Sequence, residues 1–336
     1  MDLMEKLRPR ESVLGAIKDM VPRYITREGL VLEHHIREGR FQRSLALVAA
    51  VSSLLSGLEV TYEHYRGSYS QQVMYTPVVI SLVLTITGVW AAFSRWAARV
   101  ALPIVSLVTM LDGLVGFYFH VRGVARKPGG WRIPVMNLIM GPPVFAPLLF
   151  ALSGYLGLIA SLLRREDDPQ QTTLPGLRQP RSSLLALLPR GISREGVVFE
   201  QQVREGRFQK HLAVAAGLAG LFSGLEALYS HYENNFAFPK AQWSPILLSP
   251  LMLLAGVATI PSRLVARTLL PLASALALLD GTLGFYFHAR GVLRRPGGRK
   301  LPLYNLIYGP PIFAPLLFAA SGFMGILASL LRRDDS

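Results

Sequence analysis

The chain has 336 residues, of which 51% are hydrophobic, and a formal net charge of +14. A mean hydropathy of +0.35 is too high for an ordinary soluble protein and indicates that lipid is the solvent. Because the sequence contains no cysteine, it excludes disulfides, thiolate ligands and iron–sulfur clusters held by its own residues. The basic residues flank apolar stretches and form no aromatic-interleaved patch, so no nucleic-acid partner is predicted.

The first 26 residues are charged, and they place Leu3, Leu7, Leu14 and Ile17 at helix-like spacing. This pattern predicts an amphipathic segment that lies in the membrane interface. A short solvated helix or tail is the alternative.

About eight apolar stretches follow, and each is close to the roughly 20 residues that a helix needs to cross a bilayer. In chain order they cover residues 43–65, 75–94, 98–120, 138–163, 211–232, 244–260, 266–288 and 306–331. The predicted fold class is therefore an all-α integral membrane protein with about eight transmembrane helices. Pro147 and Pro315 fall inside the fourth and eighth stretches, where each is predicted to kink the helix.

Two parts of the chain resemble each other at an offset of about 167 residues. REGLVLEHHIREGRFQ from Arg27 aligns with REGVVFEQQVREGRFQ from Arg194, and NLIMGPPVFAPLLF aligns with NLIYGPPIFAPLLF. We therefore expect two four-helix repeats, at residues 27–166 and 191–336. The polar, proline-containing residues 167–190 are predicted to be a linker with an interfacial segment.

An even number of spans in each repeat brings both repeats into the membrane from the same side. Parallel repeats with a pseudo-twofold axis along the membrane normal are therefore predicted. The N-terminal region, the SRWAAR and SRLVAR turns, the linker and the terminal LLRRDD hold about two thirds of the basic residues. By the positive-inside rule, this predicts a cytoplasmic-type membrane with both termini in the cytoplasm. The opposite loops, RGVARKPGGWR and RGVLRRPGGRK, are also basic and count against this orientation.

Four carboxylates fall inside predicted spans: Glu59, Asp112, Glu226 and Asp280. A charge at the centre of a span costs about 2.5 to 3.5 kcal/mol, so these side chains are expected to face protein. There they can relay protons or lock helices together through hydrogen bonds.

Four histidines end the first and third spans of the two repeats: His64, His120, His231 and His288. Each follows a basic entry residue by about 21 positions, which predicts a common depth. Because neutral imidazole binds zinc, copper and iron, the four are candidate metal or haem ligands. The predicted supporting partners are Tyr65, Tyr118, Asn137, Tyr232, Tyr286 and Asn305. Arg122 and Arg290 are candidate contacts for an anion or a lipid headgroup.

The positions of these groups around their helices limit the possible sites. Asp112 and His120 share one helical face, whereas Glu59 and His64 are about 140° apart on theirs, so a compact chelate within the first helix is not expected. Three functions compete. The preferred one is a membrane redox or metal/haem-handling component with its site at the repeat interface, working with a redox partner or other membrane subunits. The alternatives are a proton- or ion-coupled transporter and a non-catalytic structural subunit of a membrane complex.

Overall fold

The computed structural model describes residues 23–168, 190–236 and 239–334. Helices joined by short loops make up these residues, and no β-strand occurs among them. Most of the predicted N-terminal interfacial segment and of the predicted linker lie outside the described residues. We refer to residues 23–168 as the first half and to residues 190–334 as the second half.

The first half contains α3 (Arg23–Arg37), α4 (Gln42–Arg66), η1 (Gln72–Tyr75), α5 (Thr76–Phe93), the π-turn η2 (Ala97–Ala101), α6 (Leu102–Ala125), η3 (Gly130–Arg132), α7 (Pro134–Ile139) and α8 (Ala146–Leu162). The second half contains α9 (Arg190–Arg204), α10 (Gln209–Glu233), α11 (Pro239–Ala258), α12 (Arg263–Arg267), α13 (Leu269–Arg294), η5 (Gly298–Lys300), α14 (Pro302–Ile307) and α15 (Ala314–Leu330).

Within the described residues, 6 helices are long and apolar enough to cross a membrane. They are Gln42–Arg66, Gln72–Phe93, Ala97–Ala125, Gln209–Glu233, Lys240–Ala258 and Arg263–Arg294. Large apolar side chains such as Ile86, Phe93 and Leu247 are exposed on these helices, as expected where lipid is the neighbour. The all-helical membrane class is thus supported, whereas the expected eight full spans are not.

The difference lies in the predicted spans 138–163 and 306–331, which are broken rather than continuous. After α7 ends at Ile139, the chain passes through Pro142 and Pro143 before α8 begins at Ala146. The helix α8 has 17 residues, which is about 25 Å at 1.5 Å per residue and less than a typical hydrocarbon core. The helix α15 in the second half has the same length.

Pro147 and Pro315 therefore do not kink a helix, contrary to the sequence prediction. Each lies in the first turn of α8 or α15, where a backbone N–H would have no helical partner and the fixed φ of proline suits the helix. The two prolines mark helix starts.

The short helices α8 and α15 lie at the centre of the fold. The helix α8 packs against α6 and α4, and α15 packs against α13 and α10. Small residues permit this approach: a Cβ on Gly154 would lie 2.6 Å from the carbonyl oxygen of Ser106, and one on Gly322 would lie 2.5 Å from that of Ser274. Gly154 and Gly322 belong to the SGYLG and SGFMG segments, whose small residues let the helices approach this closely.

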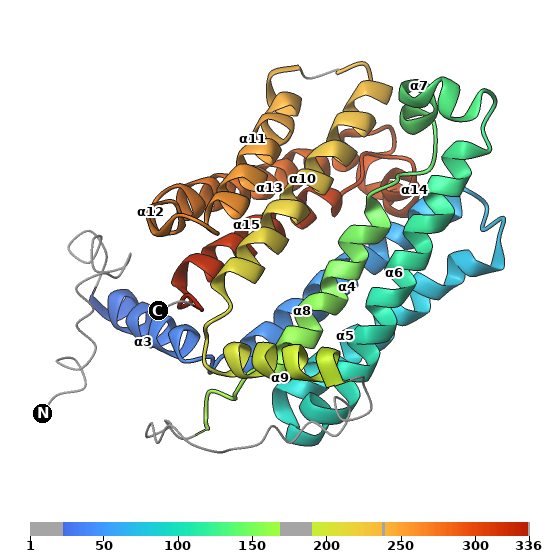
Figure 1. Cartoon of the computed structure of the whole chain (residues 1–336). Helices are drawn as coiled ribbons and strands as arrows, with labels where there is room; N and C mark the ends of the chain where they lie inside the picture. Colours follow the sequence, from blue (N-terminus) through green and yellow to red (C-terminus); the bar gives the residue numbers. More distant parts are fainter. Residues whose placement is uncertain (1–22, 169–189, 237–238, 335–336) are drawn as a thin grey trace, which may run out of the picture.

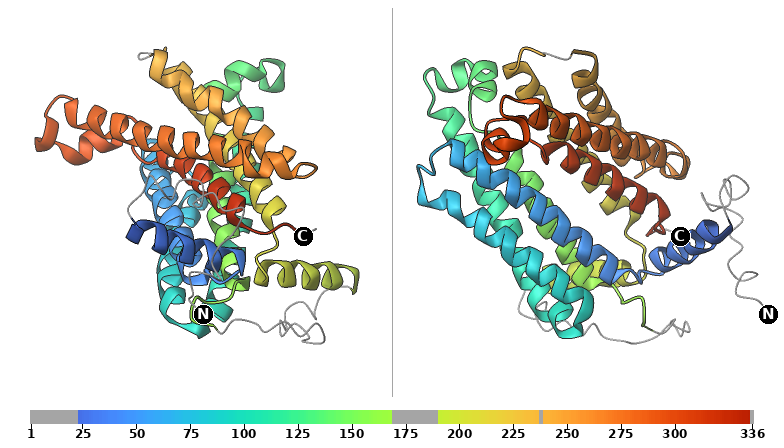
Figure 2. Two further views of the ribbon diagram at one scale, coloured as in Figure 1. Left: turned by 90° about the vertical axis from the view of Figure 1, so that its left-hand side faces the viewer. Right: turned by 180° about the vertical axis from the view of Figure 1, so that it is seen from behind.

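One apolar core includes residues of both halves. The rings of Phe41 and Phe208 stack with centroids 6.5 Å apart. Beside them, Gly39 adopts φ +66°, and a Cβ there would lie 2.6 Å from the carbonyl oxygen of Arg204. Figures 1 and 2 show α3 and α9 at the end of the bundle where α4 and α10 begin. We call this the proximal end, and the opposite end, which carries α7 and α14, the distal end.

Candidate functional site

Two carboxylates inside candidate spans each accept a hydrogen bond from a backbone N–H of the other half. Glu59 of α4 accepts a hydrogen bond through Oε2 from the backbone N–H of Phe313, at 3.1 Å, where α15 begins. Glu226 of α10 accepts one through Oε1 from the backbone N–H of Phe145, at 2.5 Å, where α8 begins. The first N–H groups of a helix lack intrahelical partners and carry partial positive charge, so a carboxylate is a stabilising cap there. Each half thus caps a short helix of the other.

Both acids face protein, as the cost of a charge in a span predicts. Glu59 precedes the end of α4 at Arg66 by about 10 Å along the helix axis. The helix α4 is continuous between these positions, so Glu59 and His64 point in different directions. The acid faces the second half, whereas the histidine faces the loops of its own half.

In the first half, both predicted histidines are anchored through Nδ1 to a backbone carbonyl. His64 of α4 lies 2.7 Å from the oxygen of Met74, and His120 of α6 lies 2.5 Å from the oxygen of Pro143. The two imidazoles are close enough to interact electrostatically. Each anchoring carbonyl belongs to a segment that precedes a helix, which ties the ring to the distal loops.

The second half shows the same contacts. His231 Nδ1 lies 3.0 Å from the oxygen of Gln242, and His288 Nδ1 lies 2.6 Å from the oxygen of Pro311. In a neutral imidazole whose Nδ1 donates to a carbonyl, Nε2 carries no hydrogen and can accept a proton or bind a metal. The four predicted histidines thus form one pair in each half.

A carboxylate accompanies each pair. Asp112 Oδ1 accepts a hydrogen bond of 2.6 Å from Thr76 Oγ1, and Asp280 is hydrogen-bonded to Ser244. Asp112 lies within electrostatic range of His64. The first half therefore holds a small polar cluster of two histidines, one aspartate and one hydroxyl near the distal end, and the second half carries the corresponding histidine pair and the Asp280–Ser244 pair. The hydroxyls were not among the sequence candidates, although Thr76 and Ser244 lie near the start of the second helix in their halves.

The clusters do not form a compact metal centre in this conformation. Among the described residues, no group of three or more His, Asp or Glu side chains is arranged to hold a metal ion. The histidines also contact loops of their own half rather than meeting at the boundary between halves, where the sequence prediction placed the site. Glu59 and Glu226, which do lie at that boundary, hydrogen-bond backbone amides instead.

Aromatic residues that sequence reasoning did not select lie beside two of the histidines. Tyr69 stacks on Tyr75 at 4.3 Å and meets His64 edge-on at 6.0 Å. Phe236 stacks on Trp243 at 4.9 Å and meets His231 at 6.4 Å. Tyr69 and Phe236 have φ of 43° and 48°, a conformation uncommon for these residue types that no sequence motif announced.

The predicted supporting partners lie elsewhere. Asn137 is buried, but its side-chain amide donates to the carbonyls of Pro128 and Gly130, at 3.1 and 2.8 Å. Asn305 makes the equivalent bonds to Pro296 and Gly298, at 3.3 and 3.1 Å. The tyrosine candidates are more than half exposed: Tyr65, Tyr118, Tyr232 and Tyr286. Arg122 and Arg290 are exposed near the ends of α6 and α13.

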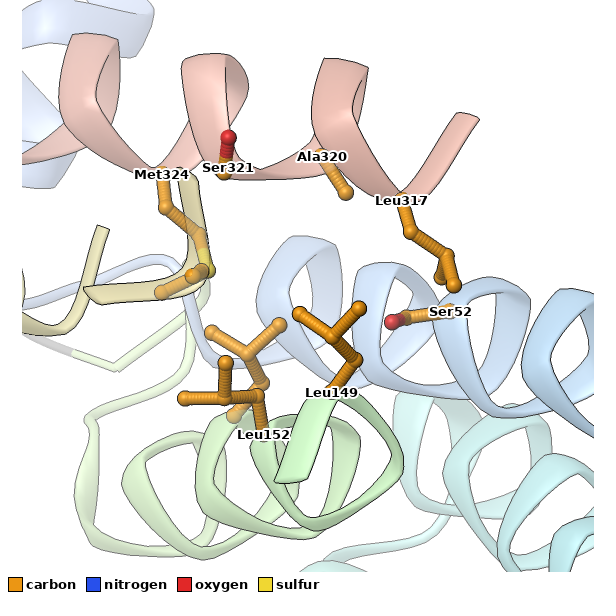
Figure 3. Close-up of a pocket in the computed structure, with 9 residues that line it drawn as sticks. Ser52, Leu149, Leu152, Leu317, Ala320, Ser321 and Met324 are labelled. Carbon is orange, nitrogen blue, oxygen red and sulfur yellow. The ribbon is translucent and has the colours of Figure 1, made fainter. Parts of the chain in front are cut away.

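A small cavity lies between the halves (Figure 3). Its volume is about 20 Å³, which is room for about one water molecule. The lining residues include Ser52, Leu149, Leu152, Leu317, Ser321 and Met324. Ser52 lies about two turns before Glu59 on α4, which is about 10 Å along the helix axis, and neither Glu59 nor Glu226 lines this cavity.

No protein-family model matches the chain, and neither a curated protein nor a solved structure matches it.

Proposed function

We propose that the protein is a proton-conducting membrane transporter built from two parallel four-helix repeats, in which Glu59 and Glu226 bind and release the proton. The supporting observation is that α8 and α15 each begin after a Gly-Pro-Pro break, against a carboxylate from the other half. Short segments interrupted by glycine or proline at corresponding positions of two halves are typical of binding sites in secondary transporters. The two halves are related by a pseudo-twofold axis along the membrane normal.

The proposed mechanism couples protonation to the contact between the halves. An ionised Glu59 is held by the N-terminus of α15, because the N–H of Phe313 and the helix dipole favour negative charge. Protonation removes that charge and weakens the contact. Glu226 does the same at the start of α8. The proton thus biases the packing of one half against the other, which is the differential interaction that a conformational switch requires.

The polar clusters provide the route by which a proton passes from the distal surface to Glu59 and Glu226. His64, Asp112 and His120 are titratable groups on the distal side of Glu59, and the second half has the same set. Acids and histidines inside spans are the usual components of proton relays. The cavity beside Ser52 lies on the proximal side of Glu59, and its lining is apolar apart from the hydroxyls of Ser52 and Ser321.

Proteoliposomes containing a pH-sensitive dye test this function. Under an imposed membrane potential, the full chain should conduct protons faster than protein-free vesicles. Replacing both Glu59 and Glu226 by Gln keeps an oxygen that accepts the backbone hydrogen bond but removes the titratable group. We expect the proton flux to fall at least about ten-fold, as for a relay acid, with the thermal unfolding temperature nearly unchanged.

The control variant is Glu63→Gln, which removes an acid that pairs with Arg66 at 3.1 Å on the same helix and should leave the flux unchanged. Wild-type flux no higher than that of empty vesicles would reject the proposal. Full flux in the double Gln variant would assign the two acids to helix capping alone.

A metal- or haem-handling role is the second candidate. The four Nδ1 hydrogen bonds favour it, because an anchored imidazole with a free Nε2 is the usual form of a metal-ligating histidine. Purified protein would then carry stoichiometric metal or show a Soret band. Replacing His64 and His120 by Gln should remove half of the signal. Protein with neither metal nor haem absorbance after growth in metal-replete medium would exclude this role.

We further propose that the proximal end faces the cytoplasm of a cytoplasmic-type membrane. The chain contains no cysteine, so a single introduced one is a clean reporter. Ser70 is exposed in the distal loop after α4, and Gln201 is exposed on α9 at the proximal end. A membrane-impermeant maleimide added to intact cells should label Ser70→Cys and not Gln201→Cys. The reverse pattern would invert the orientation.

A further inference from the structure

The distal end carries two basic hairpins with unpaired cations. The first holds Arg126, Lys127 and Arg132 between α6 and α7. The second holds Arg294, the last residue of α13, together with Arg299 and Lys300 between α13 and α14. Among the described residues, none of these six side chains forms an ion pair or a side-chain hydrogen bond. Glu63, a nearby acid, is paired with Arg66, while Glu233 lies within electrostatic range of Lys127.

The hairpins have a fixed shape. The buried amide of Asn137 bonds two carbonyls of the first hairpin, at 3.1 and 2.8 Å. Asn305 does the same in the second, at 3.3 and 3.1 Å. Gly129 and Gly297 take φ of +80° and +84°, which permits the tight turn before η3 and η5. The cations are therefore presented on an ordered backbone.

Exposed apolar side chains lie directly beside these cations. Val135 and Met136 of α7 are 68% and 56% exposed, and Leu303 and Tyr304 of α14 are 71% and 55% exposed. Trp131 is also half exposed in the first hairpin. Cations next to apolar and aromatic side chains, at the end of transmembrane helices, match the boundary between lipid phosphates and acyl chains.

We propose that the two distal hairpins are binding surfaces for anionic phospholipid headgroups of the distal leaflet. The cations bind the lipid phosphate, and α7 and α14 place their apolar side chains among the upper acyl carbons. A nucleic acid or an acidic peptide would satisfy the charges but would leave the apolar side chains in water. The predicted headgroup contact of Arg122 and Arg290 belongs to the same surfaces, because Arg122 lies in the last turn of α6 and Arg290 lies one turn before the end of α13.

Native mass spectrometry of the full chain in neutral detergent tests the proposal. The probe is an equimolar mixture of phosphatidylglycerol and phosphatidylcholine at low ionic strength. The wild type should retain phosphatidylglycerol over phosphatidylcholine by at least about ten-fold, given the attraction of each basic residue for anionic lipid. Replacing Arg126, Lys127 and Arg132 by Gln should halve the number of bound anionic lipids. Replacing all six hairpin cations by Gln should abolish the preference.

The control replaces Arg99 by Gln, because this proximal cation is exposed and forms no ion pair or side-chain hydrogen bond within the described residues, and the variant should keep the preference. Raising the salt concentration should lower the preference of the wild type, a measurement that needs no variant. Equal retention of both lipids by the wild type, or a full preference in the six-fold variant, would overturn the proposal. Displacement of the lipid by inorganic phosphate, but not by chloride of equal ionic strength, would identify a free-phosphate site and also overturn it.

Discussion

The proximal and distal ends of the bundle are both rich in arginine but use it differently. At the proximal end, the buried side chain of Arg165 donates to the carbonyls of Ala91 and Ala92 at the end of α5, at 3.4 and 3.1 Å. Arg333 donates in the same way to the carbonyls of Thr259 and Ile260, at 2.6 and 3.0 Å. The hairpin cations of the distal end make no such bonds within the described residues.

The comparison shows that a count of basic residues does not reveal their role. The last carbonyls of a helix have no helical partner, so a buried guanidinium that reaches them stabilises the fold. A cation with no internal partner is available to the surroundings. Proximal arginines should therefore matter for stability, and distal ones for what the protein binds.

The largest difference in stability is expected between the variants Arg165→Met and Arg126→Met. The first removes the guanidinium that donates to the carbonyls of Ala91 and Ala92 and pairs with Asp167 at 3.3 Å. Asp167 keeps its ion pair with Arg43 at 2.7 Å, and the carbonyl of Ala91 keeps the Gln42 amide at 3.4 Å, so the loss falls mainly on Ala92 and on the buried packing of the side chain. We expect a loss of about 3 kcal/mol in the free energy of unfolding for Arg165→Met and almost none for Arg126→Met. Denaturation in detergent micelles, followed by helical circular dichroism, measures both. Equal stability of the two variants would erase the distinction between the ends.

Replacing a glycine by alanine should cost more stability at the proximal end than at the distal end. At the proximal Gly39, φ is +66° and an alanine Cβ would lie 2.6 Å from a backbone oxygen of Arg204, which cannot move without separating the halves. Gly39→Ala should cost about 2 to 3 kcal/mol. At the distal Gly129, the Cβ would meet the side chain of Ile133, which can rotate, so Gly129→Ala should cost about 1 kcal/mol. The same denaturation experiment tests this order, and a reversal would contradict the close contact between halves.

A smaller effect is expected at Glu166, which caps α4 from the end of the first half. Its carboxylate accepts hydrogen bonds from the backbone N–H groups of Arg43 and Ser44, at 3.2 and 3.1 Å. Glu166→Ala should lower the free energy of unfolding by about 1 kcal/mol, as for other lost caps. The distal Glu63→Ala breaks only a solvent-exposed ion pair, and should change it by less than about 0.5 kcal/mol. A larger loss for Glu63→Ala would show that distal ion pairs also support the fold.

The smallest effect is a pH dependence at the proximal end. Burial lowers the pKa of His35 in the folded protein, and the positive charge of Arg40 lowers it further. The unfolded state then binds a proton more readily, so stability is full above the unfolded pKa and falls as the pH drops below it. His35→Gln, which reproduces the aligned Gln202 of the second half, should make the unfolding temperature less dependent on pH between about pH 8 and pH 5. An unchanged slope would remove His35 from the acid response.

The helices could be predicted where solvent preference decides the structure. All six long spans coincide with predicted apolar stretches, because hydropathy measures the preference for lipid. The fourth predicted span of each half failed for a backbone reason. Its apolar residues continue through Gly141, Pro142 and Pro143, so hydropathy does not register that the helix stops there.

For the candidate site, the sequence indicates the residues but not the groups that they contact. The cost of a charge in lipid predicts that Glu59 faces protein, yet its partner Phe313 lies 254 residues away and offers only a backbone N–H. Any residue type except proline provides that group, so no side-chain pattern could identify it. The histidines were likewise predictable as a set, whereas the carbonyls that orient their rings come from irregular segments.

The sequence by itself determined that the long helices prefer lipid to water, and it determined their approximate positions. Both depend on the summed transfer free energies of local stretches. It also determined that certain acids and histidines occur inside those helices. The tertiary structure alone decided which half caps which helix, which arginines reach helix-end carbonyls and which stay unpaired. Those outcomes depend on backbone groups brought together from distant parts of the chain, and every residue carries such groups alike.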